Sequence, residues 1–271
     1  MKSVKKITKV VGPFVGFGNR FHPETKAMLK ELLPIVDKPS IQYAAEEAVA
    51  AGIDTLIVVT GRNNRANECH FEENNELETM LGAKGKDAQA DMVCNIISEG
   101  LGCIFVRQAE ELGFGRAVLH WNVQTADDLL TDYEPGVPLE IAQAFASTGK
   151  SQLSGMEVDG PDISKYVDVL LNWSGASILG LVQKPNANDA ASNLVSIRRY
   201  ALNTDIFETL KGLSARLGGK ILSRDAINMH VQKGSVETVR LIGRRFDTGS
   251  VDGFFHASGY EYEQRLASYY V

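Results

Sequence analysis

The chain has 271 residues, of which 44% are hydrophobic, and a formal net charge of -6. This length and apolar content can build a sizeable folded core, and the negative charge argues against a general nucleic-acid surface, which needs an excess of cations. No apolar run is long enough for a membrane span or a signal-peptide core, so we expect a cytoplasmic protein that contacts no membrane.

The first expected strand leads into a glycine-containing loop. Ile7 to Val11 is a β-branched run that predicts a buried parallel strand, and Gly16, Gly18, Arg20 and Lys30 follow it. Glycine lets a ligand approach backbone N–H groups closely, while arginine and lysine donate to phosphate oxygens. The loop therefore either holds a polyphosphate or is a surface loop with turn glycines and solvated cations. It has neither the third glycine of a dinucleotide fingerprint nor the Gly-Lys-Ser/Thr ending of a P-loop.

Helical and strand patterns alternate through the rest of the N-terminal half. This rhythm predicts a Rossmann-like parallel sheet, in which ligands bind at the carboxyl edge of the strands. The glycine loop would lie at that edge. The expected elements are a helix at Ile41–Ala51 ended by Gly52, a strand at Thr55–Val59, helices at Glu76–Lys84 and Asp87–Ile97, and a strand at Cys103–Arg107.

The C-terminal half continues the alternation without a repeat or a low-complexity linker. We therefore expect one domain over residues 1–271 that ends in a helical tail at 251–271. The other expected elements are helices at Pro138–Ser147 and Thr204–Leu213 and strands at Gln152–Val158, Ala176–Pro185 and Val236–Ile242.

Three cysteines, Cys69, Cys94 and Cys103, have no spacing typical of a metal site. Their odd number predicts reduced, mostly buried thiols rather than disulfides.

The stretch from Val10 to Pro39 closely resembles the N-terminal signature of bacterial UTP–glucose-1-phosphate uridylyltransferases. That signature runs from a strand through Gly-x-Gly-Thr-Arg-Phe, x-Pro-x-Thr-Lys and Pro-Lys-Glu to Leu-Pro-Ile-Val-Asp-Lys-Pro. The resemblance continues in order from about Val4 to Gly253. It implies an α/β, Rossmann-like three-layer nucleotidyltransferase fold with a mostly parallel mixed central sheet. The matching residues are Gly16, Gly18, Arg20, Phe21, Pro23, Thr25, Lys26, Lys30, Glu31 and Leu33 to Pro39.

The resemblance also implies a reaction and its participants. Glucose 1-phosphate would attack the α-phosphorus of UTP in the presence of Mg2+, giving UDP-glucose and pyrophosphate, in a homo-oligomer such as a dimer or tetramer. The implied catalytic residues are Arg20, Lys30 and Lys184. The implied substrate contacts are Gly16, Gly18, Glu31, Gln108, Gly113, Tyr166 and Gln183. The implied Mg2+ ligands are Asp127 or Asp128, together with Asp247.

Local sequence leaves other interpretations of several of these residues open. Adjacent aspartates such as Asp127 and Asp128 are also common helix N-caps, and Asp247 lies in an Asp-Thr-Gly run typical of turns. Gln108 could simply precede a helix whose entry contains Gly113.

Several motif positions depart from the family pattern, and the segment from His120 to Asp128 is shorter than its counterpart. That shortening is either a true deletion or an imperfection in the written sequence. The first hypothesis is an active uridylyltransferase, and the departures leave open a second, a catalytically impaired relative that binds a nucleotide sugar or a partner subunit in a regulatory role. An NAD-dependent dehydrogenase is disfavoured, because the glycine fingerprint is incomplete. The departing residues are Asn19, Leu29, Arg116, Val167, Gln183, Arg198, Lys220 and Leu222.

Overall fold

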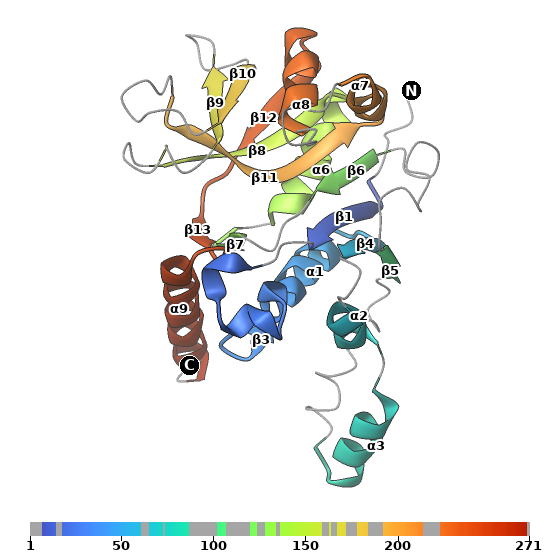
Figure 1. Ribbon diagram of the computed structural model, residues 1–271, viewed down its shortest axis with the longest axis vertical. Coiled ribbons are helices and arrows are strands. Elements are labelled where there is room, and N and C mark those ends of the chain that lie inside the picture. Colours follow the sequence, from blue (N-terminus) through green and yellow to red (C-terminus); the bar gives the residue numbers. More distant parts are fainter. Residues whose placement is uncertain are drawn as a thin grey trace. The chain divides into compact units, whose positions relative to one another are not determined.

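The computed structural model divides the chain into two compact units (Figure 1). Unit 1 comprises Met1–Thr8, Gly113–Val123 and Asp132–Gly243, and unit 2 comprises Lys9–Leu112, Gln124–Thr131 and Arg244–Val271. The organisation as one domain stays a prediction. The structure describes residues 7–14, 18–60, 65–72, 74–86, 102–106, 120–123, 128–133, 136–158, 163, 167–171, 178–183, 192–213 and 223–269.

Unit 2 contains the parallel sheet expected from the N-terminal half. Strands β1 (Lys9–Phe14), β4 (Thr55–Thr60) and β5 (Gly102–Val106) pair in parallel, in the order β1-β4-β5. β1 extends three residues beyond the predicted end, because its pairing with β4 continues to Phe14. A Cβ at Gly12 would lie 2.4 Å from the buried Phe14 ring.

Helix α1 (Ser40–Ala50) packs its small, apolar face against this sheet. Ile41, Ala44 and Ala48 are buried together with residues of β1 and β4. The helix ends as predicted, since Gly52 adopts the left-handed conformation (φ 69°) that suits the residue after a helix.

The remaining described elements of unit 2 include short strands and three α-helices. The predicted helix at Glu76–Lys84 is confirmed as α3, and the one at Asp87–Ile97 lies outside the described residues. Cys69 is exposed on α2, so the expectation of a buried thiol is wrong there. These elements are α2 (Arg65–Phe71), α3 (Asn75–Ala83), α9 (Val251–Tyr269) and the antiparallel pairs β2 (Pro34–Ile35) with β3 (Lys38–Pro39) and β7 (Asp128–Thr131) with β13 (Arg244–Asp247).

Unit 1 is built around β11, which pairs antiparallel with β6, β8 and β9. β12 pairs in parallel with β8, so this sheet is mixed. β6 has four residues. The strands are β6 (His120–Val123), β8 (Ser151–Glu157), β9 (Val167–Leu171), β10 (Ile178–Gln183), β11 (Leu194–Asn203) and β12 (Val236–Arg240), and the helices are α6 (Val137–Thr148), α7 (Ile206–Gly212) and α8 (Ser223–Gln232).

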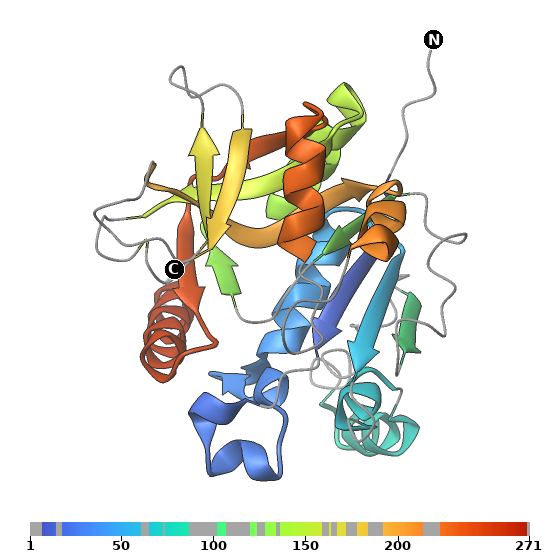
Figure 2. The same cartoon turned by 45° about the horizontal axis from the view of Figure 1, so that its top comes forward.

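Helix α8 lies beside β10, the strand at the end of the sheet order (Figure 2). The Asn228 side chain accepts the Leu181 N–H at 2.7 Å and donates to the Leu181 carbonyl at 3.1 Å. One side-chain amide thus satisfies backbone groups that an edge strand would otherwise expose.

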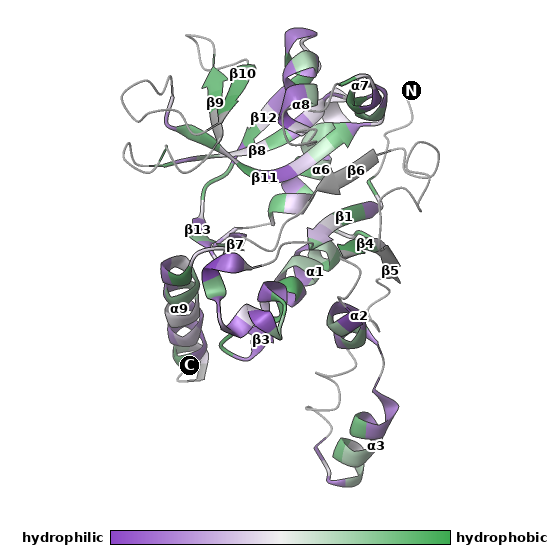
Figure 3. Ribbon diagram, viewed as in Figure 1, coloured by the Kyte–Doolittle hydropathy of each residue, from purple (hydrophilic) through white to green (hydrophobic). Residues whose placement is uncertain are grey.

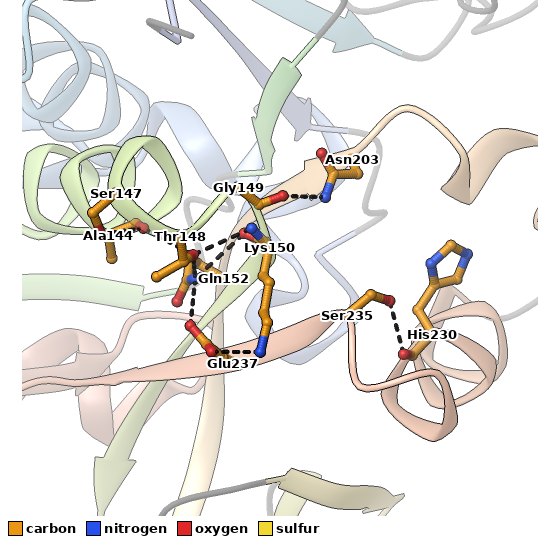
Figure 4. A network of polar contacts seen from close by, with 10 residues as sticks. All are labelled: Ala144, Ser147, Thr148, Gly149, Lys150, Gln152, Asn203, His230, Ser235 and Glu237. Atoms are coloured by element: carbon orange, nitrogen blue, oxygen red, sulfur yellow. Dashed lines mark hydrogen bonds and ion pairs between the residues drawn. The ribbon is translucent and has the colours of Figure 1, made fainter. Parts of the chain in front are cut away.

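A polar network joins β8 to β12 (Figure 4). The Lys150 ammonium lies 2.9 Å from one Glu237 carboxylate oxygen, and the Gln152 amide donates to the other at 3.3 Å. The hydrogen bond from Lys150 is the main reason that the pKa of Glu237 is lowered. These contacts support the pairing register of β8 and β12, two strands that are far apart in the sequence.

Arg198 interrupts β11 with a left-handed backbone (φ 61°), at a bulge between Ser196 and Tyr200. The resembling family has glycine at this position, which this conformation favours. We expect Arg198→Gly to be more stable than Arg198→Ala by about 1 kcal/mol, because both remove the side chain but only alanine keeps the strained Cβ. Urea denaturation of the two variants measures this difference. Equal midpoints would contradict the strain.

Every helix among the described residues is too short or too polar to cross a membrane.

Candidate active site

The β7–β13 ladder brings two predicted metal ligands together within unit 2. Asp128, the first residue of β7, lies directly opposite Asp247, the last residue of β13. Side chains at opposed positions of an antiparallel pair project from the same face, with Cβ atoms about 4.5–5.5 Å apart. The two carboxylates therefore share one face of the ladder.

Asp128 is buried and begins a strand, so its interpretation as a helix N-cap is wrong. Its carboxylate forms an ion pair with the Arg245 guanidinium, and the two side chains are only 3% and 10% exposed. Arg245 and Asp247 are two residues apart on β13 and project from the same face. The second acidic candidate, Asp127, lies outside the described residues.

Asp247 also organises the turn that joins β13 to α9. One of its carboxylate oxygens accepts the Gly249 N–H at 3.2 Å, and its backbone carbonyl accepts the Ser250 hydroxyl at 2.9 Å. The turn expected from the local sequence is therefore present. Since this leaves the second carboxylate oxygen outside that turn contact, the turn and a metal-binding role are compatible.

The glycine loop approaches the same turn. Arg20 donates from Nη1 to the Gly249 carbonyl at 3.1 Å, which places its exposed guanidinium beside the residues that follow Asp247. Gly18 precedes Arg20 in a left-handed conformation (φ 61°), and a Cβ there would lie 2.8 Å from a Thr25 methyl carbon. Only glycine fits this backbone without displacing Thr25, whose hydroxyl donates to the Gly18 carbonyl at 2.8 Å.

Lys30 and Glu31 lie on a short 3-10 turn in the same loop. The Lys30 ammonium is 3.8 Å from one oxygen of the buried Glu31 carboxylate. Burial raises the pKa of Glu31, and the charge of Lys30 partly opposes that shift. The other Glu31 oxygen, Oε2, is buried without a hydrogen-bond partner among the described residues.

The C-terminal part of α9 contacts the β2–β3 turn and helix α1. Arg265 forms an ion pair with Asp37, which lowers the pKa of Asp37, and the Tyr43 hydroxyl lies 3.4 Å from a Glu261 carboxylate oxygen. Burial is the main reason that the pKa of Tyr43 rises to about 12. The C-terminal part of α9 is thus joined to the β2–β3 turn and to α1, while Arg20 contacts the turn that begins the helix.

Two carboxylates of the ladder, Asp128 and Asp247, are the candidate ligands for a divalent cation. Mg2+ binds oxygen ligands and uses one or two carboxylates, with phosphates and waters completing its octahedron. Both carboxylates lie on one face of the ladder, but Asp128 is only 3% exposed and already ion-paired with Arg245. Among the residues placed by the structure, no group of three or more His, Cys, Asp and Glu side chains forms a fuller metal cluster.

Two comparisons with known proteins identify the family of this chain. The nucleotidyl transferase family matches residues 15–264. A UTP–glucose-1-phosphate uridylyltransferase of Staphylococcus saprophyticus is 37% identical over 263 residues, covering 93% of this chain and 90% of the relative. The chain belongs to the UDP-glucose pyrophosphorylase family. The resemblance seen from Val10 to Pro39 is thereby confirmed.

Solved UDP-glucose pyrophosphorylases have the same fold. An apo crystal structure matches with a TM-score of 0.85 and 36% identity, over 96% of this chain and 99% of that one. A complex with UDP-glucose matches with a TM-score of 0.82 and 34% identity, over 95% and 99%. The predicted α/β nucleotidyltransferase fold is therefore confirmed.

Several predicted site residues of this UDP-glucose pyrophosphorylase family member stay predictions. Gln183 is the last residue of β10 in unit 1, and its side chain is not described. Those outside the described residues are Gly16, Gln108, Gly113, Tyr166, Lys184 and Asp127.

Sequence reasoning missed Arg245 and Gly253. The Arg-Arg-Phe-Asp run carries a usable signal, because strand alternation puts Arg245 on the face of Asp247. Gly253 is required by close approach, since a Cβ there would lie 2.2 Å from the Asp247 carbonyl oxygen. Sequence alone carries no signal of that contact.

Proposed function

We propose that this chain transfers a uridylyl group from UTP to glucose 1-phosphate, with Mg2+, giving UDP-glucose and pyrophosphate. The observation that carries the proposal is the β7–β13 ladder, where Asp128 and Asp247 share a face beside the loop residue Arg20. Membership of the UDP-glucose pyrophosphorylase family supports it.

In the proposed reaction, a phosphate oxygen of glucose 1-phosphate attacks the α-phosphorus of UTP, and the bond from that phosphorus to the pyrophosphate oxygen breaks. No covalent enzyme intermediate is needed, so the protein contributes mainly positioning and charge stabilisation. When bound, Mg2+ would neutralise negative charge on the phosphates. Asp247 with Asp128 or Asp127 would hold it.

The other roles follow the family resemblance. Arg20 and Lys30 would hold the triphosphate of UTP, and Lys184 the phosphate of glucose 1-phosphate. The remaining proposed contacts are Gln108 and Gly113 with the uracil, Tyr166 and Gln183 with the sugar, and Gly16, Gly18 and Glu31 around the loop.

We also propose a single-domain cytoplasmic protein that forms a homo-oligomer, either a dimer or a tetramer. Exposed apolar side chains on α9 support the oligomer. Figure 3 shows hydrophobic and hydrophilic bands along this helix. Four of these side chains are Val251, Phe255, Tyr262 and Leu266. Their spacing places them on one helical face.

The test separates turnover from binding. The purified chain is incubated with UTP, glucose 1-phosphate and Mg2+, and UDP-glucose is measured by chromatography while its binding is measured by calorimetry. We expect product that requires both substrates. Binding of UDP-glucose without any product would instead support the impaired, regulatory relative.

A further inference from the structure

We propose that Phe254 is a positioning residue for the glycine loop. Its ring packs on Phe21, the neighbour of Arg20, and thereby keeps the Arg20 guanidinium beside the Asp247 turn, where it binds the triphosphate of UTP. The ligand and the role of Arg20 rest on the proposed function, whereas the ring contact rests on the structure of unit 2 alone.

Two adjacent loop residues contact the start of α9. The ring centroids of Phe21 and Phe254 are 5.7 Å apart and the ring planes meet at 74°, which is the edge-to-face arrangement that aromatic rings prefer. Arg20 donates to the Gly249 carbonyl at 3.1 Å, and this exposed hydrogen bond competes with bonds to water. The ring pair therefore supplies an apolar attachment that water does not replace.

Phe254 has a fixed place relative to the Asp247 turn. The Ser250 hydroxyl donates to the Asp247 carbonyl at 2.9 Å, and the Phe254 N–H donates to the Ser250 carbonyl at 2.9 Å. One turn further along α9, Ala257 is fully buried and packs in one apolar cluster with Leu129 of β7. The Phe254 ring therefore projects from a helix whose first turns are joined both to Asp247 and to the β7–β13 ladder.

The loop offers little burial of its own around Arg20. Arg20 and Phe21 belong to a short 3-10 turn at Asn19–Phe21, none of whose residues is buried. The Phe21 N–H donates to the Gly18 carbonyl at 2.8 Å, which closes this turn. A turn with so little burial is ordered mainly by the few side-chain contacts that it makes. Without the Phe254 ring, UTP would have to order Arg20 on binding, and the entropy lost in that ordering would weaken its affinity.

UTP affinity is the first readout, measured by calorimetry at a fixed Mg2+ concentration. Phe254→Ala should bind UTP about fivefold more weakly than wild type, which is the size expected for loss of one aromatic pair. Phe254→Tyr keeps the ring and should bind UTP as wild type does. The matched control is His256→Ala, which removes an exposed ring from the same helix and should also bind as wild type does.

Turnover and coupling to Arg20 separate positioning from general packing. In Phe254→Ala the KM for UTP should rise about fivefold, while the KM for glucose 1-phosphate should not change. A residue that only packs the core would change both values or neither. In an Arg20→Met background, Phe254→Ala should weaken UTP binding by no more than about twofold, because the guanidinium that it positions is already absent.

Hydrogen exchange at the Phe21 amide provides a readout without any ligand. The bond from this amide to the Gly18 carbonyl should open more often in Phe254→Ala, so the amide should exchange faster than in wild type and in His256→Ala. Phe254→Leu keeps much of the apolar volume but lacks the ring. It should change exchange and UTP affinity in the same direction, and it replaces the alanine variant if that variant does not fold.

Wild-type UTP affinity in folded Phe254→Ala, or an equal loss of affinity with and without Arg20, would overturn the inference. Unchanged exchange at the Phe21 amide would overturn it as well, whether or not the chain makes UDP-glucose. A wild-type chain that binds UTP but forms no UDP-glucose would contradict the proposed function alone, so the two failures are distinguishable.

Discussion

Asp247→Asn is expected to lower the rate of UDP-glucose formation by a hundredfold or more. The substitution preserves shape and can still accept the Gly249 N–H, but it removes one of two carboxylates that share the face of the β7–β13 ladder. Removal of one preorganised electrostatic group commonly costs a factor of about 10²–10³ in turnover. Steady-state kinetics at saturating substrates measures the effect.

Asp54→Asn is the matched control, because Asp54 is an exposed aspartate just before β4, at the amino end of that strand. Ligands in such sheets bind at the carboxyl ends. The control should keep wild-type turnover. Equal activity of Asp247→Asn and Asp54→Asn would remove Asp247 from the site.

Gly253→Ala is expected to damage both stability and turnover. The new Cβ would lie 2.2 Å from the Asp247 carbonyl oxygen and 2.8 Å from its carbonyl carbon. Because both atoms belong to the backbone, either α9 or the Asp247 turn must shift. Such overpacking typically costs 1–3 kcal/mol, and a displacement of about 1 Å at a catalytic group can lower the rate about a hundredfold.

Gly82→Ala serves as the control for the intrinsic effect of alanine in a helix. A Cβ at Gly82 in α3 meets nothing within 4 Å, so this change should raise stability by up to about 1 kcal/mol. Urea midpoints and turnover are measured for both variants. A Gly253→Ala protein as stable and active as Gly82→Ala would show that the turn tolerates the displacement.

The local sequence pattern was sufficient to predict the bounds of elements that bury one face. The helix at Ile41–Ala51 and the strand at Thr55–Val59 were predicted to within one residue, because periodicity and Gly52 mark them clearly. The family signature likewise drew attention to Arg20, which the structure places beside the Asp247 turn and whose role stays a prediction. These features depend on neighbours along the chain.

Features set by distant contacts were not predictable in the same way. β11 lacks the alternation of a half-exposed strand, because seven of its ten residues are buried, including Arg199. The N-cap interpretation of Asp128 failed because a strand far along the chain, β13, pairs with it. The pairing partner Arg245 follows Asp128 by 117 residues, so no local window contains both.

The most direct test of the account is the release of pyrophosphate by the wild-type chain when UTP, glucose 1-phosphate and Mg2+ are supplied together. We expect release that equals UDP-glucose formation, requires both substrates, stops on chelation of the metal and falls a hundredfold or more in Asp247→Asn. Pyrophosphate release no faster than in buffer, from folded protein that still binds UDP-glucose, would contradict it.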